Sequence, residues 1–201
     1  MLAPRKKLWS SPPQVAKAAC DLLGLEPGDV LADFGCGDAV ALVTAAGHVG
    51  CRAIGWEIDS PRAAAASARV AELGLSDLVK IHAGNALEAD PTGITSVFLY
   101  LIERGLRMVL PLLGRIAAAL PASTPLRVVT VLYRLPVPLV PTEIRHVQLS
   151  TDVRFPLFLY LLTSSQVEAA VAALSVGALG GNRGPGAEFS STDSISHDGC
   201  S

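Results

Sequence analysis

A short run of acidic and glycine residues, Asp33-Phe34-Gly35-Cys36-Gly37, is the part of the sequence best suited to bind a small ligand. Glycines let the backbone adopt dihedral angles that side chains forbid and pass close to a ligand. A second acid, Glu57, follows ~20 residues later, and its carboxylate can accept hydrogen bonds from both hydroxyls of a ribose. This spacing predicts a site for a ligand that contains a nucleoside.

The elements around these residues predict a strand, a glycine turn, a helix and a second strand. Residues 30–34 are apolar, the chain breaks at the glycines, and residues 39–46 favour a helix. Residues 51–56 are apolar again and end at Glu57. In such a βαβ unit, unpaired N–H groups at the start of the helix and the acid at the end of the second strand face the same ligand.

The rest of the chain continues this alternation and then changes. Further strands are expected at residues 79–82, 96–102, 126–135, 144–149 and 155–162, and further helices at 14–23, 62–73, 106–120 (interrupted at Pro111) and 165–174. The unbroken apolar run at 96–102 is typical of a strand covered on both faces. The sequence thus predicts an α/β, Rossmann-like sheet of seven strands, mostly parallel, with an antiparallel strand near the C-terminus.

Composition limits the classes of protein and partner. The chain has 201 residues, of which 50% are hydrophobic and 17% charged, with a formal net charge of -2. These values predict one folded domain at residues 10–175, a flexible N-terminus at 1–9 and a disordered tail at 176–201. They also argue against a nucleic-acid partner. The four cysteines and four histidines have no metal-site spacing, so no metal is expected.

The sequence also bears on membrane association and compartment. The most apolar region, residues 94–120, carries Glu103 and three arginines, so no transmembrane segment is expected. Unpaired cysteines favour a reducing intracellular compartment. Arg5, Lys6 and Lys7 without a neighbouring acid suit either a mitochondrial leader or a solvated basic N-terminus. We therefore expect a mitochondrial or cytoplasmic protein.

The central motif differs from that of dinucleotide-binding proteins. It reads D-x-G-C-G rather than G-x-G-x-x-G, and Val40 stands where the third glycine would allow close approach to a pyrophosphate. S-adenosylmethionine lacks phosphate and needs a partner for its α-ammonium, which Asp33 can supply. The sequence from residue 10 to 163 resembles the class I S-adenosylmethionine-dependent methyltransferases, whose first motif is commonly D-x-G-x-G.

The resemblance implies a role for each matching position. The methionine part of the cofactor would lie against Asp33, Gly35, Cys36 and Gly37. The ribose would be held by Glu57, and the adenine would lie against Ile58, Asn85 and Ala86. Tyr100 and Glu103, which follow the fourth expected strand, would face the methyl group and the acceptor and are the candidate catalytic residues.

Several of these residues also have plain structural interpretations. Cys36 suits a small packing role more than a reactive thiol, because no neighbouring His or Lys would activate it. Asp38 and Asp59 are more often turn or cap residues. The tyrosines at 100, 133 and 160 are more often core or rim residues than catalysts.

A narrower resemblance concerns the acceptor. Ser11-Pro12-Pro13 before the first helix and the later segments AIGWEID, AGNALEAD and SVFLYLIE are similar to a small family of protein-lysine methyltransferases. That family includes the mitochondrial enzymes that act on the ATP synthase c-subunit and on the adenine nucleotide translocase. The segment Thr130-Val131-Leu132-Tyr133 departs from the family's S-H-x-F-like stretch. The resemblance implies a protein-lysine acceptor; a small-molecule methyltransferase and a non-catalytic cofactor-binding protein are the alternatives.

Overall fold

A computed structural model describes residues 10–180, with side chains described from 10 to 175. Its centre is a seven-stranded sheet in the order β3-β2-β1-β4-β5-β7-β6. The strands are β1 (Val30–Phe34), β2 (Arg52–Glu57), β3 (Val79–Ala83), β4 (Ser96–Leu99), β5 (Leu126–Val131), β6 (Glu143–Gln148) and β7 (Arg154–Leu162). The first five are parallel, and β7 is antiparallel to both β5 and β6. This confirms the predicted fold class.

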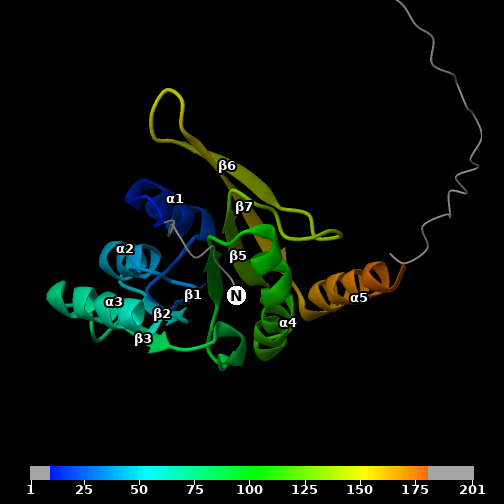
Figure 1. The fold of residues 1–201 in the computed structure, drawn as a ribbon, viewed down its shortest axis with the longest axis horizontal. Helices are drawn as coiled ribbons and strands as arrows, with labels where there is room; N and C mark the ends of the chain where they lie inside the picture. Colours follow the sequence, from blue (N-terminus) through cyan, green and yellow to red (C-terminus); the bar gives the residue numbers. More distant parts are fainter. Residues whose placement is uncertain (1–9, 181–201) are drawn as a thin grey trace, which may run out of the picture.

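The helices lie in two groups on opposite sides of this sheet (Figure 1). They are α1 (Pro13–Leu23), α2 (Val40–Val49), α3 (Ser60–Glu72), α4 (Glu103–Ala119) and α5 (Ser164–Gly180), with a 3₁₀ turn η1 (Ala86–Glu88). Helices α1 to α3 cover one side, and α4 and α5 pack together on the other. All residues of β1 and β4 are buried, as expected for central strands covered on both faces.

Two strands and two helices differ most from the predictions made from the sequence; one of these helices, α5, continues to Gly180 instead of ending at residue 174. β4 ends at Leu99 rather than at residue 102, and β5 ends at Val131 rather than at residue 135. The apolar residues that follow each strand line the end of the sheet instead of extending it. Helix α4 begins at Glu103 and continues through Pro111 without interruption. Burial of the flanking Leu110 and Leu112 offsets the missing backbone donor of that proline.

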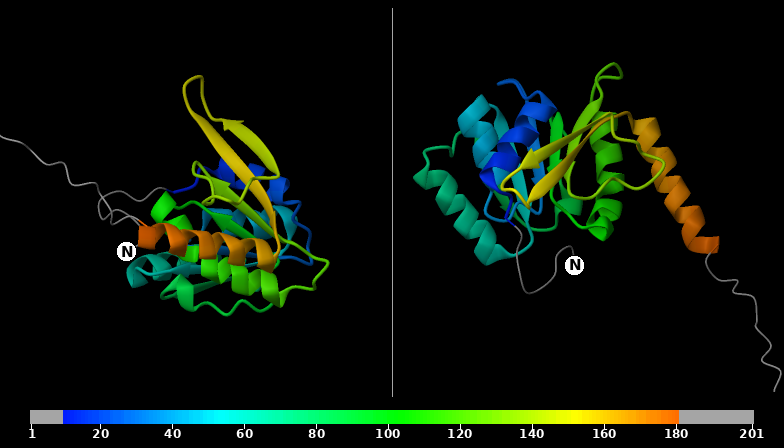
Figure 2. Two further views of the ribbon diagram at one scale, coloured as in Figure 1. Left: turned by 90° about the vertical axis from the view of Figure 1, so that its right-hand side faces the viewer. Right: turned by 90° about the horizontal axis from the view of Figure 1, so that it is seen from above.

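The last two strands form a hairpin that extends beyond the rest of the fold (Figure 2). β7 pairs with β5 up to the Val131–Leu157 register, and its first residues continue past the end of β5 to pair with β6. The hairpin therefore overhangs the edge at which the parallel strands end. Such an overhang can contact a molecule that approaches this edge.

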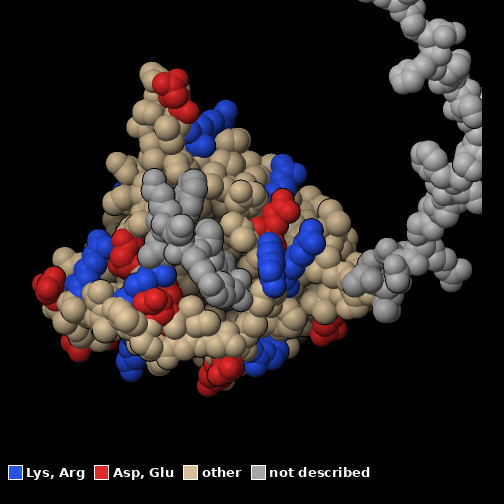
Figure 3. Space-filling view, in the orientation of Figure 1, with Lys and Arg blue, Asp and Glu red and all other residues tan. Residues whose placement is uncertain are grey.

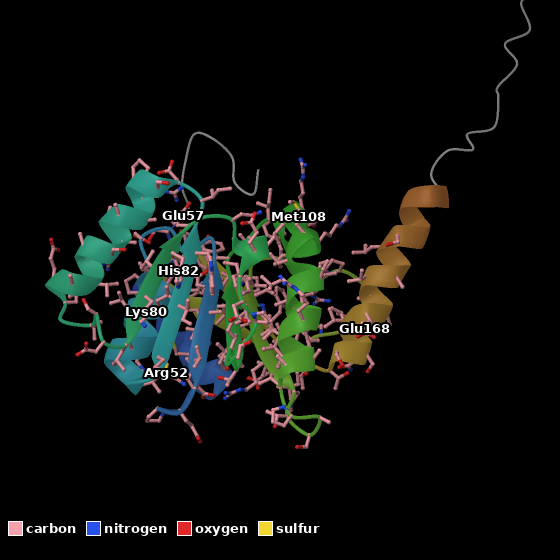
Figure 4. All side chains as sticks on the ribbon, turned by 90° about the horizontal axis from the view of Figure 1, so that it is seen from below. Arg52, Glu57, Lys80, His82, Met108 and Glu168 are labelled. Atoms are coloured by element: carbon pink, nitrogen blue, oxygen red, sulfur yellow. The ribbon has the colours of Figure 1, made fainter. Side chains whose placement is uncertain are left out.

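The side of the sheet that carries α4 and α5 is open over β2 and β3, where no helix lies across the strands (Figure 4). Arg52, Lys80 and His82 are exposed there, and the His82 ring stacks on Trp56 at a centroid distance of 5.3 Å. The connection from β3 to β4 supplies only η1, which is too short to cover these strands.

Two further findings concern residues 10–180. No helix in this part of the chain is long and apolar enough to cross a membrane. Within the same range, no three His, Cys, Asp or Glu residues are grouped in a way that could hold a metal ion. Lysine and arginine are interspersed with acids on the face drawn in Figure 3. The predictions for residues 1–9 and 181–201 lie outside the described residues.

Candidate active site

The predicted site residues meet at the carboxyl edge of the parallel strands. The register aligns Phe34 with Trp56, Glu57 with Ala83 and Leu99 with Thr130, so the loops after β1 to β5 begin at one level. Figure 4 shows Glu57 at this edge and Met108, near the start of α4, at the same edge. In open α/β sheets, ligands bind outside the carboxyl ends of the strands, where the strand order reverses. Here that reversal lies between β1 and β4.

Asp33 is a buried acid at the end of β1. Its exposed fraction is 5%, and no hydrogen bond from the described residues contributes to its ionisation. Burial, followed by the neighbouring Glu57 and Asp38 carboxylates, raises the pKa of Asp33 from 3.8 to about 8. Burying an unpaired carboxylate is costly, and a cation beside it would remove that cost. The geometry therefore suits an ammonium group of a ligand.

Glu57 holds the glycine turn from the neighbouring strand. Its Oε2 accepts a hydrogen bond from the Gly37 N–H at 3.0 Å, and its Oε1 accepts one from the Asp59 N–H at 3.0 Å. The Arg62 guanidinium lies 3.7 Å from Oε2. These contacts fix the orientation of the carboxylate and leave it further acceptor capacity for ligand hydroxyls, because each oxygen has two lone pairs.

The glycine turn adopts a backbone that needs its glycines. Gly35 and Gly37 have φ angles of 93° and 56°, which lie in the region that favours glycine. The N–H groups of Gly35 and Cys36 both donate to the Trp56 carbonyl, at 2.8 and 3.0 Å. The turn is thus attached to β2 by its own backbone as well as by Glu57.

Cys36 is buried and packs against β2, in agreement with the plain interpretation of this residue. A Cβ at Gly55 would lie 2.7 Å from its Sγ, so the thiol occupies the space that the glycine leaves. Burial, followed by the Asp33 and Glu57 carboxylates, raises the pKa of the Cys36 thiol far above its usual value. A thiol of this kind is not a nucleophile at neutral pH.

The residues expected to contact an adenine lie at the same edge but differ in their exposure and in the hydrogen bonds that they already make. Ile58 is 61% exposed, although it is a large apolar side chain, and so offers an apolar surface beside Glu57. The Gly84 N–H donates to the Glu57 carbonyl at 2.9 Å and brings the loop after β3 to this position. There, the Asn85 amide accepts from the Leu87 N–H and caps η1, and Ala86 is buried.

The two candidate catalytic residues follow β4. Tyr100 is partly buried, and its hydroxyl has no hydrogen-bond partner among the described residues. Burial, with a smaller contribution from Tyr133, raises its pKa, so the hydroxyl stays protonated. Leu101 packs under Gly35, at 3.5 Å from a Cβ built there, which places this segment beside the glycine turn. Glu103 is exposed at the start of α4.

Reasoning from sequence alone missed several residues around this site. Arg62, in the first turn of α3 after the Asp59 cap, adds a cation beside Glu57. Asp38 accepts a hydrogen bond from the Ser10 hydroxyl at 2.7 Å and so joins the segment before α1 to the glycine turn. The sequence signal for Arg62 is its position in the first turn of the helix that follows the acidic strand end. Ser10 has no such signal, because it is 28 residues from Asp38 in the sequence.

The site fits S-adenosylmethionine in its chemistry. The buried Asp33 carboxyl suits an α-ammonium, the oriented Glu57 carboxylate suits ribose hydroxyls, and the exposed Ile58 suits an adenine face. The start of α2 is not a glycine-rich phosphate-binding turn, because the buried Val40 begins this helix. These features favour S-adenosylmethionine over a dinucleotide as the ligand.

Comparison with known proteins agrees with this geometry. No protein-family model matches the chain. A protein-lysine N-methyltransferase of Saccharolobus islandicus (strain REY15A) is 29% identical over 106 residues, which cover 52% of this chain and 66% of that protein. The matched stretch thus spans just under two thirds of the relative's length.

Solved structures show the same fold. An RNA methyltransferase from Salinibacter ruber, in complex with S-adenosyl-L-homocysteine, has a TM-score of 0.66 and 27% identity, covering 76% of this chain and 93% of that one. Geranyl diphosphate C-methyltransferase from Streptomyces coelicolor A3(2) has a TM-score of 0.54 and 19% identity, covering 72% and 77%. The chain has the fold of class I S-adenosylmethionine-dependent methyltransferases.

Proposed function

We propose that this chain is an S-adenosylmethionine-dependent methyltransferase and that its acceptor is the ε-amine of a protein lysine. The observation that carries the first part is the buried Asp33 carboxyl, close to the Glu57 carboxylate and without a hydrogen-bond donor among the described residues. The second part is supported by the similarity to the Saccharolobus islandicus protein-lysine N-methyltransferase.

The residues of the chain have separate tasks in this proposal. S-adenosylmethionine, when bound, supplies a methyl group on a sulfonium: the acceptor nitrogen forms the new N–C bond, the S–C electron pair stays on sulfur, and the amine proton goes to solvent. Asp33 and Glu57 hold and orient the cofactor. Tyr100, whose buried hydroxyl has no hydrogen-bond partner among the described residues, is the candidate residue for orienting the acceptor nitrogen toward the methyl carbon. Most of the catalysis is positioning.

The acceptor must also lose a proton before it reacts. A free lysine has a pKa of ~10.4, and only the neutral amine has a lone pair to donate. Partial burial of the acceptor amine beside Tyr100, which is itself partly buried, would disfavour the charged form of the amine and so favour deprotonation without a dedicated base. Glu103, exposed at the start of α4, would attract the ammonium form as it approaches.

A second candidate acceptor is RNA. The Salinibacter ruber structure favours it, since that RNA methyltransferase matches over 93% of its length at 27% identity. The sequence lacks the N-P-P-Y or D-P-P-Y box that stacks planar amines after the fourth strand, and the chain carries a net charge of -2. Both features favour a lysine over a base. The compartment remains as expected from the sequence, mitochondrial or cytoplasmic.

The deciding experiment is transfer of a labelled methyl group to a fractionated lysate from which endogenous methyltransferase activity has been removed by heating. Label in the protein fraction, followed by mass spectrometry of the labelled residue, is the expected result. Label confined to RNA or to small molecules would replace the lysine assignment. A Glu57→Ala variant is the control, because label that persists in it would not originate from this site.

A further inference from the structure

Strands β2 and β3 have one face that no helix of the described residues covers (Figure 4). Side chains at alternate positions of the two strands point to it: Arg52, Ile54 and Trp56 from β2, and Lys80 and His82 from β3. We call this surface the β2–β3 face. The intervening Ala53 and Val79 are buried on the opposite side, against α2 and α3. Parallel strands are usually covered on both faces, so an uncovered pair is a candidate surface for a partner.

The charged side chains of the β2–β3 face are all basic. Arg52, Lys80 and His82 are exposed, and Figure 4 shows them in a column along the two strands. Within residues 10–180, no carboxylate lies at ion-pair distance from any of the three. Arg115 of α4 donates to the Leu87 carbonyl at 2.8 Å and so adds a cation beside the connection that leaves β3. The face thus favours an anionic partner.

The acids closest to the face in the chain leave these cations without a partner. Glu88 accepts a hydrogen bond from the Asn85 amide at 3.3 Å, and Asp90 accepts one from the Thr92 N–H at 3.0 Å. Both acids therefore make contacts within the connection from β3 to β4. Asp77, just before β3, is the acid that comes nearest, because it lines the same cavity as two of the cations.

This cavity, of about 200 Å³, lies at the amino end of the face. Arg52 and Lys80 line it together with three apolar side chains, those of Val30, Ile54 and Leu78. An apolar cavity of ~150 Å³ can hold a group the size of benzene. The cavity can therefore accept one apolar side chain of a partner, with two cations beside it.

The face has the dimensions of one helix. Neighbouring strands lie ~4.8 Å apart, so two strands and their side chains offer a width close to the ~10 Å diameter of a helix. β3 has five residues, and its length of ~16 Å equals that of ~11 helical residues. Helices α4 and α5 pack together on this side of the sheet, so a helix laid over β2 and β3 would extend the same layer.

Two other classes of partner fit the face less well. A second copy of this chain, bound through the same face about a two-fold axis, would bring like charges together. A single-stranded nucleic acid would need free aromatic faces on which its bases stack. The Trp56 ring lies instead between Phe34 and His82, at centroid distances of 5.4 and 5.3 Å, so rings of the same sheet already lie on both sides of it.

We propose that the β2–β3 face binds an acidic amphipathic helix of a partner protein. One apolar side chain of that helix enters the cavity beside Ile54, and its acids lie against Arg52 and Lys80. Exposed ion pairs contribute little each, so the apolar contact supplies most of the affinity and the charges select the partner. This interaction does not depend on which acceptor the enzyme methylates.

The test titrates the full chain with a synthetic helical peptide of about 14 residues, which has leucines along one stripe and glutamates on both sides of it. Its counterpart carries lysine in place of each glutamate. At low salt, the wild type should bind the acidic peptide about tenfold more tightly than the basic one. Arg52→Glu combined with Lys80→Glu should weaken binding of the acidic peptide about tenfold, and Asp77→Asn should strengthen it about twofold.

The matched control is Arg104→Glu combined with Arg154→Glu, which reverses two other exposed charges and should bind the acidic peptide as the wild type does. Equal affinity for the two peptides, or an undiminished affinity in the Arg52→Glu and Lys80→Glu variant, would overturn the proposal. Tighter binding of oligouridine, lost in that variant, would replace the protein partner with a nucleic acid. A dimer that this variant dissociates would replace it with a second copy.

S-adenosylhomocysteine binding is measured on the same samples. It should be equal in the wild type and in the Arg52→Glu and Lys80→Glu variant, because both residues lie at the amino end of the strands, away from Glu57. Equal binding shows that the variant is folded. Absence of S-adenosylhomocysteine binding to the wild type would overturn the proposed function and leave the peptide result standing, which separates the two failures.

Discussion

At the scale of single residues, the acid at position 33 determines how the free protein responds to pH. Its pKa is raised from 3.8 to about 8, so the folded chain keeps this proton where the unfolded chain loses it. The stabilisation from this group is complete below pH 3.8 and is lost as the pH rises through about 8. Binding of an α-ammonium should make the ionised form of Asp33 the favoured one, because a cation stabilises the carboxylate.

Cofactor binding should therefore release a proton from Asp33. We expect the affinity for S-adenosylmethionine to rise with pH, by up to about tenfold per pH unit, until the pH reaches about 8. Isothermal titration calorimetry in buffers of different ionisation enthalpy measures the released proton. Asp33→Asn should bind more weakly and release none, and the exposed Asp77→Asn should behave as wild type. Equal proton release in Asp33→Asn would show that another group is responsible.

The candidate catalytic pair gives a second test at this scale. Tyr100→Phe removes the hydroxyl that has no partner among the described residues, and Glu103→Gln removes an exposed charge. Each should lower kcat by about 10²-fold, the lower end of the 10²–10⁴ range that positioned proton-transfer groups contribute. Cofactor affinity should stay unchanged, because neither residue contacts the glycine turn through a hydrogen bond. Unchanged turnover in both variants would contradict the assignment.

At the scale of elements, the contact between the glycine turn and β2 is the tightest in the site. A Cβ at Gly55 would lie 2.5 Å from Leu42 Cδ1 and 2.7 Å from Cys36 Sγ. Gly55→Ala should therefore reduce the free energy of unfolding by about 1–3 kcal/mol and displace the turn, which weakens cofactor binding. Urea denaturation and calorimetry measure the two effects.

The matched control is Gly47→Ala in α2, where an added Cβ meets nothing within 4 Å. That change should stabilise the helix by about 0.5–1 kcal/mol. If Gly55→Ala is as stable as Gly47→Ala, Cys36 and Leu42 can move aside and the contact does not fix the turn.

The elements also show how much the sequence could predict. Buried strands bounded by turn residues, such as β1, have a pattern that local sequence determines, and Asp33 and Glu57 could be placed from it. The ends of β4 and β5 could not be predicted from the sequence, because apolar residues continue past the end of each strand. What ends β5 is the left-handed Leu132, held by the carbonyl of Pro156 from β7. The position of Tyr133, just beyond this strand end, depends on such long-range contacts.

At the scale of the whole molecule, the edge opposite the site holds the layers together. The Arg127 guanidinium, at the start of β5, donates to the carbonyls of Leu23 and Gly24 at 3.0 and 2.8 Å and pairs with Asp29. The Asp29 carboxylate also accepts from the Thr95 hydroxyl at 2.8 Å and from the Glu26 N–H at 2.8 Å. This network joins the end of α1 to β1 and to the segment before β4.

Removing the cation from this network should destabilise the fold and spare the site. Arg127→Met leaves the largely buried Asp29 without its ion pair and two carbonyls without donors, so the free energy of unfolding should fall by about 2–4 kcal/mol. Arg145→Met breaks the exposed pair with Glu143 and should cost under about 0.5 kcal/mol. Adding Asp29→Asn to Arg127→Met should recover part of the loss, because the two residues interact directly.

Cofactor affinity, measured well below the unfolding temperature, should match wild type in all of these variants, since the network lies at the amino edge. A loss in Arg127→Met no larger than that in Arg145→Met would mean that packing alone joins the layers.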